Sequence, residues 1–166
     1  MNNPSTFWED LKSGHFVSMV KETSQGQILS NSQEVYNVMK PLFAENDDVE
    51  TVYCIFLNAK NRILAIEKMF SGTISSSAIY PRELVKRIIA LKSSAIVLTH
   101  NHPSGFVEPS AEDKAITVRM AIALASIDVT LHDHIIIGDE FHSMADSGFL
   151  QSVRSRYNDL LSLKKS

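Results

Sequence analysis

The chain has 166 residues, of which 44% are hydrophobic and 21% charged, so it is long enough to bury one sizeable core and is most simply a single domain. Its formal net charge of −3 gives no global reason to expect direct DNA binding, for which a basic excess is typical. The single cysteine, Cys54, excludes an intramolecular disulfide, and no stretch reaches the roughly 20 apolar residues of a membrane-spanning helix, so we expect a cytoplasmic protein with no membrane partner.

The first part of the chain predicts an arm, a strand and a helix. Residues 1–14 have no clear periodicity and are predicted to form a loosely packed arm before a domain of residues 15–166. The apolar run in 15–22 suits a short strand. Ser32 is the expected N-cap of a helix that Pro41 should end or kink. The buried face of this helix is expected to contain Val35, Val38, Met39 and Leu42.

The middle of the chain predicts a β-hairpin followed by a helix. Residues 49–57 and 62–70 are both rich in β-branched and aromatic residues, and NAKN separates them. A loop follows, and Pro81 suits the first position of a helix. The apolar face of that helix is expected to contain Leu84, Val85, Ile88, Ile89 and Leu91.

The last part alternates strands with helices. The run AIVLTH at 95–100 predicts a strand buried on both faces, and Ser110 should open the next helix, with Ile116, Met120, Ala123 and Leu124 on its buried side. Residues 129–138 predict a long strand that pairs with 141–145, and 147–163 predict a terminal helix. This order predicts a single-domain α/β fold, with a mixed β-sheet flanked by helices on both sides.

The segment at residues 98–117, LTHNHPSGFVEPSAEDKAIT, contains the candidate metal-binding residues. Side chains two apart in an extended chain point the same way, so His100 and His102 can present two imidazoles to one point at the end of a strand. Asp113, in the first turn of the next helix, could supply a third ligand. Three such ligands, with a fourth position left for water, are what a catalytic zinc site needs, and a neighbouring acid or base must then move the proton.

The string H-x-H-x7-S-x2-D, filled by His100, His102, Ser110 and Asp113, resembles the metal signature of the JAMM/MPN+ (JAB) metallopeptidases. Residues 70–117 and the later LHDHIIIG are more closely similar to the RadC-like branch of that superfamily. The resemblance covers roughly residues 50–145. It implies a JAB/MPN, cytidine-deaminase-like, three-layer arrangement.

The resemblance also implies a role for each matching residue. His100, His102 and Asp113 would hold Zn²⁺, Glu50 would act as general base and acid, and Ser110 would donate a hydrogen bond to the oxyanion. Glu50 is favoured over other glutamates for this role only by its position at the start of its strand. Four other glutamates are also available for this role: Glu34, Glu45, Glu67 and Glu108.

This sequence departs from the RadC-like pattern in three places. No helix-hairpin-helix pattern precedes Glu50, which makes an inherited DNA-repair role less favoured. The strand that usually ends in Leu-Asp here ends in Leu57-Asn58, and His132 stands where an apolar residue is usual. None of these departures touches the metal set.

Several residues also have a purely structural interpretation. Ser110 and Asp113 approximate a capping box, which would explain both without any chemistry but leaves the two histidines unexplained. We interpret Asp133 and His134 as a hydrogen-bonded structural pair rather than a second site. Cys54 is interpreted as a packed small hydrophobe rather than a nucleophile.

The sequence therefore predicts a zinc-dependent hydrolase of peptide or isopeptide bonds, with a protein or peptide substrate. The family resemblance also implies an association with DNA repair, which the missing helix-hairpin-helix pattern makes less favoured. The alternative is a non-catalytic metal-binding module, or a DNA-repair or mobile-element accessory module. Direct DNA binding is left open, and exposed strand edges are compatible with a homodimer.

Overall fold

The computed structural model describes residues 14–44, 47–73 and 79–162. These residues form five helices: α2 (His15–Ser24), α3 (Ser32–Phe43), α4 (Pro81–Leu91), α5 (Ala111–Ala125) and α6 (Phe149–Ser162). They also form five strands: β1 (Thr51–Leu57), β2 (Ile63–Ser71), β3 (Ala95–Asn101), β4 (Thr130–Ile137) and β5 (Phe141–Ser143). Among these residues, no helix is both long and apolar enough to cross a membrane.

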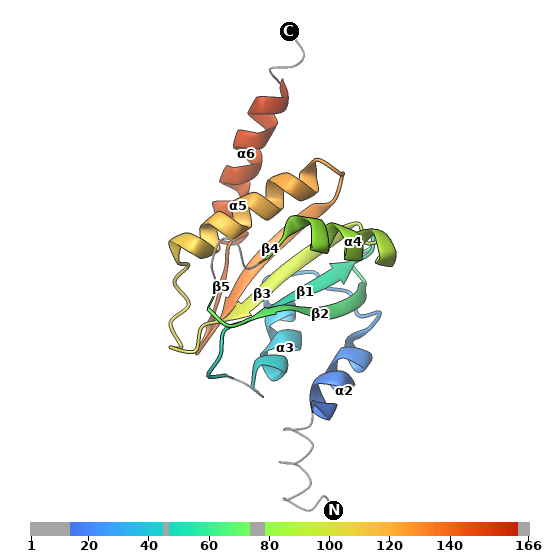
Figure 1. Cartoon of the computed structure of the whole chain (residues 1–166), viewed down its shortest axis with the longest axis vertical. Coiled ribbons are helices and arrows are strands. Elements are labelled where there is room, and N and C mark those ends of the chain that lie inside the picture. The colour runs from blue at the N-terminus through green and yellow to red at the C-terminus, as the bar shows by residue number, and fades with distance from the viewer. Residues whose placement is uncertain (1–13, 45–46, 74–78, 163–166) are drawn as a thin grey trace, which may run out of the picture.

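The strands form one mixed, open sheet in the order β2-β1-β3-β4-β5. Strand β1 is antiparallel to both β2 and β3, β3 runs parallel to β4, and β4 is antiparallel to β5. Helices α2 and α3 lie on one side of this sheet, and α4 and α5 lie on the other (Figure 1). The predicted α/β fold, with a mixed sheet between helices, is therefore confirmed.

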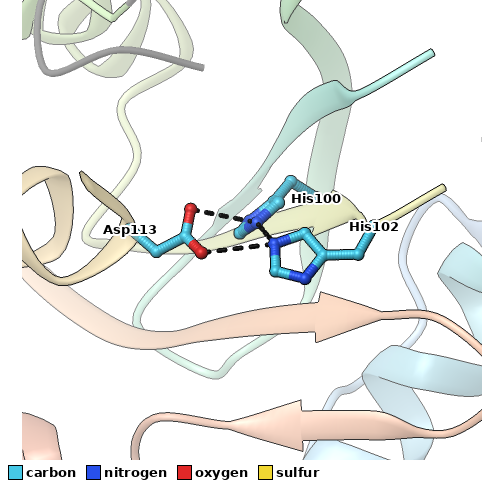
Figure 2. A group of neighbouring side chains, drawn as sticks. All are labelled: His100, His102 and Asp113. Carbon is cyan, nitrogen blue, oxygen red and sulfur yellow. Dashed lines mark hydrogen bonds and ion pairs between the residues drawn. The ribbon is translucent and has the colours of Figure 1, made fainter. Parts of the chain in front are cut away.

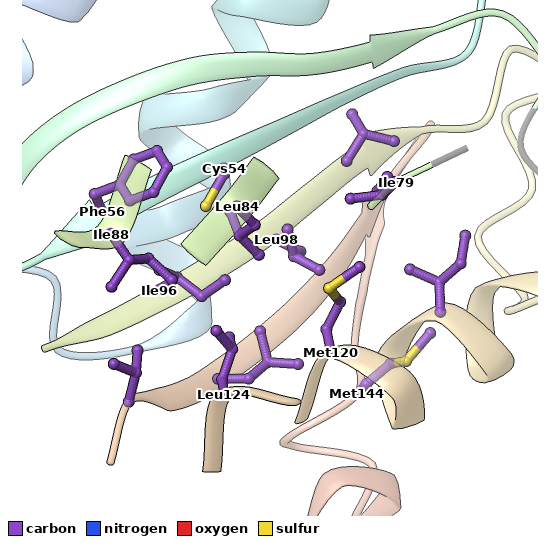
Figure 3. Packing of buried hydrophobic residues seen from close by; sticks show 14 of the residues in the cluster. Cys54, Phe56, Ile79, Leu84, Ile88, Ile96, Leu98, Met120, Leu124 and Met144 are labelled. Carbon is purple, nitrogen blue, oxygen red and sulfur yellow. The ribbon is translucent and has the colours of Figure 1, made fainter. Parts of the chain in front are cut away.

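Each face of the sheet has its own hydrophobic core. On one face, side chains of β1 and β3 pack against α4 and α5 (Figure 3); these include Cys54, Phe56, Leu84, Ile88, Ile96, Leu98, Met120 and Leu124. On the other face, α3 covers the sheet through Val35, Val38, Met39, Leu42 and Phe43. Burying each large apolar side chain contributes about 1.5–3 kcal/mol, so both layers stabilise the central strands.

Strand β3 shows how this architecture positions His100, one of the predicted metal ligands. All of its seven residues are buried, as expected for a strand covered on both faces. Because side chains alternate along a strand, Ile96 and Leu98 face α4 and α5, whereas Val97 faces α3. The same alternation directs His100 toward the α5 side, at the end of the strand.

Some predictions about the elements were wrong. Residues 15–22 lie in helix α2 rather than a strand, and the half-buried or buried positions 16, 17, 20, 21 and 24 follow helical spacing. The N-cap of α3 is Asn31, whose side chain accepts a hydrogen bond from the Glu34 backbone N–H, and α3 continues past Pro41 to Phe43. In α4, Ile89 is 69% exposed and does not belong to the core.

Other predictions were confirmed, including the β1–β2 and β4–β5 hairpins and Pro81 at the start of α4. The predicted N-terminal arm lies almost entirely outside the described residues, apart from Gly14 at the N-cap of α2. The division into an arm and a domain therefore stays a prediction.

Candidate metal centre

His100, His102 and Asp113 meet at the C-terminal end of β3 and the first turn of α5 (Figure 2). The Nε2 atoms of His100 and His102 are 2.9 Å apart. Each Nε2 lies 3.2 Å from a carboxylate oxygen of Asp113, His100 from Oδ1 and His102 from Oδ2. The structure thus brings together all three residues whose spacing predicted a metal site.

The chemistry of this donor set fits a metal ion. Four ligands at about 2.0–2.1 Å around a tetrahedral zinc ion lie about 3.3 Å from one another, close to the separations found among these three residues. Two imidazoles and a carboxylate suit zinc and several other divalent first-row metals. The side chains of His100 and Asp113 are buried whereas that of His102 is 13% exposed, so the centre opens to solvent beside His102.

Electrostatics favours an anionic ligand at position 113. Burial by itself raises the pKa of the Asp113 carboxyl group, but hydrogen bonds with His100 and His102, the charge of His100 and the Ser110 backbone N–H outweigh it. The pKa of Asp113 is therefore held well below its usual range. In turn, the hydrogen bond with Asp113 raises the pKa of His102, as do the Phe106 carbonyl and the charge of Glu50.

The loop after β3 orients His102. The Nδ1 atom of His102 is 2.8 Å from the carbonyl oxygen of Phe106, which can only accept, so Nδ1 donates and Nε2 faces Asp113. The loop rests on the β4–β5 turn, where the Asp139 backbone N–H donates to the Gly105 carbonyl oxygen over 3.0 Å. A Cβ atom at Gly138 would lie 2.3 Å from that carbonyl oxygen, so only glycine allows this close approach.

Ser110 is the N-cap of α5. Its Oγ accepts from the Asp113 backbone N–H over 3.0 Å, and Oδ2 of Asp113 accepts from the Ser110 backbone N–H over 2.8 Å. The capping box considered in the sequence analysis is therefore present. Capping uses only a lone pair of Oγ and leaves the hydroxyl proton available for another acceptor. The structural and the catalytic interpretation of Ser110 are therefore compatible.

Glu50 is half-buried and lies immediately before β1. It lines a cavity of about 570 Å³ together with His102, Ser110 and Asp113. The other glutamates are placed differently. Glu67 is paired with Arg87 and Glu34 accepts from the Ser30 backbone N–H, whereas Glu108 is exposed and does not line the cavity; Glu45 lies outside the described residues.

The segment that carries Glu50 is held by Asn101, the residue between the two histidines. The side chain of Asn101 is buried and faces away from the metal ligands, toward β1. Its Oδ1 accepts from the Thr51 backbone N–H over 2.7 Å, and its Nδ2 donates to the Val49 carbonyl oxygen over 3.1 Å. Asn101 thus fixes the backbone on both sides of Glu50, a role that the sequence analysis missed.

The place of His134 beside the candidate metal ligands was not predicted from the sequence. Its Nε2 lies 2.8 Å from Nδ1 of His100, so it contacts a predicted metal ligand directly. Burial lowers the pKa of His134 well below its ordinary value. The only signal for this contact was a histidine within the isoleucine-rich strand β4, which lies beside β3.

The predicted hydrogen bond between Asp133 and His134 is present, but it joins the Asp133 carboxylate to the backbone N–H of His134 and not to its ring. Neighbouring residues in a strand point to opposite faces, so the two side chains diverge. Asp133 also accepts from the backbone N–H group of Ala145 and from the hydroxyl of Ser143. Asp133 is therefore structural, as expected, whereas the ring of His134 contacts His100 of the candidate metal centre.

The fold and the site together define a class: a three-layer α/β domain with a candidate His-His-Asp metal centre at the end of a central strand. Residues 29–149 match the RadC-like JAB domain, and this chain belongs to that family. The family resemblance drawn from the sequence motif is confirmed.

Several bacterial proteins are similar to this chain. A UPF0758 protein of Thiobacillus denitrificans is 40% identical over 134 residues, which are 80% of this chain and 59% of the relative. A UPF0758 protein of Stutzerimonas stutzeri is 46% identical over 123 residues, or 74% of this chain and 54% of the relative. A UPF0758 protein of Photobacterium profundum is 38% identical over 142 residues, or 85% of this chain and 62% of the relative.

This chain thus spans between about a half and three fifths of the length of these curated relatives. The prediction that a DNA-repair role is less favoured here stays a prediction.

Proposed function

We propose that this domain is a zinc-dependent hydrolase of amide bonds, acting on a peptide or isopeptide bond. The observation that carries the proposal is one cavity lined by Glu50, Ser110, His102 and Asp113. It combines two candidate metal ligands with a carboxylate and a hydroxyl that are not needed to hold a metal. Membership of the RadC-like JAB family supports the proposal, because the wider JAB superfamily includes metallopeptidases.

Each group in the cavity has a distinct task in this proposal. Zinc held by His100, His102 and Asp113 would supply Lewis-acid polarisation and make water more acidic. Glu50 accepts the proton of the attacking water and returns it to the leaving nitrogen, so the carboxylate is regenerated. The hydroxyl of Ser110 donates a hydrogen bond to the carbonyl oxygen as negative charge develops on it. Losing one such donor typically costs about 10²–10³-fold in turnover.

The first experiment measures the metal content of wild type, Asp113→Asn and Glu50→Gln by elemental mass spectrometry, after purification without chelators. About one zinc per chain is expected in wild type, much less in Asp113→Asn, and a full equivalent in Glu50→Gln. If wild type takes up no zinc even after zinc is added back, the proposal fails.

The second experiment screens the zinc-loaded protein against peptide and isopeptide libraries. Glu50→Gln should abolish cleavage, whereas Glu108→Gln, which changes an exposed carboxylate outside the cavity, should cleave as wild type does. Cleavage that survives Glu50→Gln would remove Glu50 from the mechanism. Zinc binding without any cleavage, together with an affinity for DNA that falls as salt rises, would instead favour the accessory module.

A further inference from the structure

Behind the metal centre, a line of buried hydrogen bonds leads from one candidate ligand to the backbone of another. Nδ1 of His100 lies 2.8 Å from Nε2 of His134. Nδ1 of His134 lies 2.6 Å from Oγ1 of Thr117, and that Oγ1 lies 2.6 Å from the backbone carbonyl oxygen of Asp113. His100 and Thr117 are 0% exposed and His134 is 2% exposed, so water does not compete along this line.

The direction of each hydrogen bond follows from the carbonyl at one end. A carbonyl oxygen only accepts, so the single hydroxyl proton of Thr117 is donated to Asp113. The sulfur of Met144, 3.2 Å from the same Oγ1, is a weaker acceptor and does not compete well for that proton. Oγ1 of Thr117 can then only accept from His134, which places the proton of His134 on Nδ1.

His134 carries only this one proton. The ring is buried and its nitrogens contact His100 and Thr117 rather than a carboxylate, so a positive charge on it would be uncompensated. Its Nε2 is therefore an acceptor, and Nδ1 of His100 must carry the proton that is donated to it. With Nδ1 committed as the donor to His134, the nitrogen of His100 that is left to release its proton and bind a metal is Nε2, the atom that faces His102 and Asp113.

We propose that His134 and Thr117 are positioning residues that fix the tautomer and ring orientation of His100 for metal binding. Both candidate histidine ligands are then held in the same tautomer by different means. His102 donates directly to the Phe106 carbonyl, whereas His100 reaches a carbonyl through two intervening side chains. The inference rests on the metal-binding part of the proposed function and does not depend on hydrolysis.

The test measures the zinc dissociation constant of the full chain by competition with a chromophoric chelator at fixed pH. His134→Leu removes the acceptor for His100, and Thr117→Val removes the hydroxyl while nearly preserving shape. Each is expected to weaken zinc binding by about 10–100-fold, the usual effect of losing the partner of a metal-bound histidine. His134→Gln, whose carbonyl oxygen can accept from His100, should bind zinc more tightly than His134→Leu.

Thr99→Val is the matched control. Thr99 is also a fully buried threonine and is adjacent to His100 in β3, but within the described ranges its hydroxyl has no hydrogen-bond partner. Its replacement should leave zinc affinity within about twofold of wild type. Equal zinc affinities in Thr117→Val and Thr99→Val would overturn the inference, as would wild-type affinity in a folded His134→Leu.

Nitrogen NMR of ¹⁵N-histidine-labelled wild type gives a readout that does not require any variant to fold. In the zinc-loaded protein, His100 and His134 should each show a proton on Nδ1 and none on Nε2. A proton on Nε2 of His134 would refute the donor order. If wild type binds zinc and substitutions at position 134 do not change the affinity, only this inference fails. If the zinc-loaded protein cleaves nothing, only the hydrolase proposal fails. If the protein binds no zinc, both fail.

Discussion

Replacing Asn101 by alanine should loosen the segment that carries Glu50 while leaving the metal ligands in place. The substitution removes the hydrogen bonds to the Thr51 N–H and the Val49 carbonyl, at 2.7 and 3.1 Å. The buried Thr51 N–H left unpaired costs about 1–3 kcal/mol, and the lost bond to the half-buried Val49 carbonyl costs about 0.5–1.5 kcal/mol, so the two together should cost about 2–4 kcal/mol. At about 1.4 kcal/mol per factor of ten, this corresponds to a roughly 30- to 700-fold increase in local opening.

Hydrogen exchange followed at the Thr51 amide measures this opening directly. The matched control is Asn58→Ala at the other end of β1, because Oδ1 of Asn58 also accepts from two backbone N–H groups, those of Lys60 and Arg62, at 2.9 and 3.0 Å. Both variants should lose stability, but only Asn101→Ala should expose the Thr51 amide and, once a cleaved substrate is available, lower turnover. Wild-type protection of Thr51 in Asn101→Ala would refute the reasoning.

Three further outcomes are expected. Gly138→Ala should displace the loop that holds His102 and weaken zinc binding, because its Cβ would lie 2.3 Å from the Gly105 carbonyl oxygen. The control is Gly148→Ala, whose Cβ would meet nothing within 4 Å and which should therefore cost only backbone strain. Chelator competition measures the effect on zinc binding, and thermal unfolding measures the effect on stability. Burial and the charge of Arg154 lower the pKa of His132. Below about pH 6.5 the unfolded chain therefore binds more protons than the folded chain, and stability falls as the pH falls. His132→Gln should make this fall less steep in urea titrations from pH 7 to 5.5, by at most about 1.4 kcal/mol per pH unit, and an unchanged slope would contradict the prediction. Burial raises the pKa of the Cys54 thiol, so iodoacetamide at pH 8 should label it only after unfolding, and rapid labelling of the native protein would argue against the packing described.

Local patterns in the sequence predicted much of the fold and the metal set. The run 95–98 is continuously apolar and begins the fully buried strand β3. Pro81 begins α4 because its fixed φ and missing N–H suit a first helical turn. His100 and His102 could be predicted as metal ligands because side chains two residues apart in a strand point the same way. Asp113 could be predicted because it lies in the first turn of the next helix. Helix α2 was missed because 15–22 is short and apolar, a pattern that fits either a strand or a helix.

What the sequence by itself determined is therefore the local part: the elements with strong periodicity, the His-His-Asp set within one strand, loop and helix, and the membership of the RadC-like JAB family. Only the tertiary structure decided which groups surround that set. Glu50 reaches the cavity because β1 pairs with β3 and Asn101 holds its neighbours, and His134 reaches His100 because β4 lies parallel to β3. These contacts join residues 34 to 52 positions apart, and a pattern read along one strand or helix carries no information about which distant residue will lie beside it.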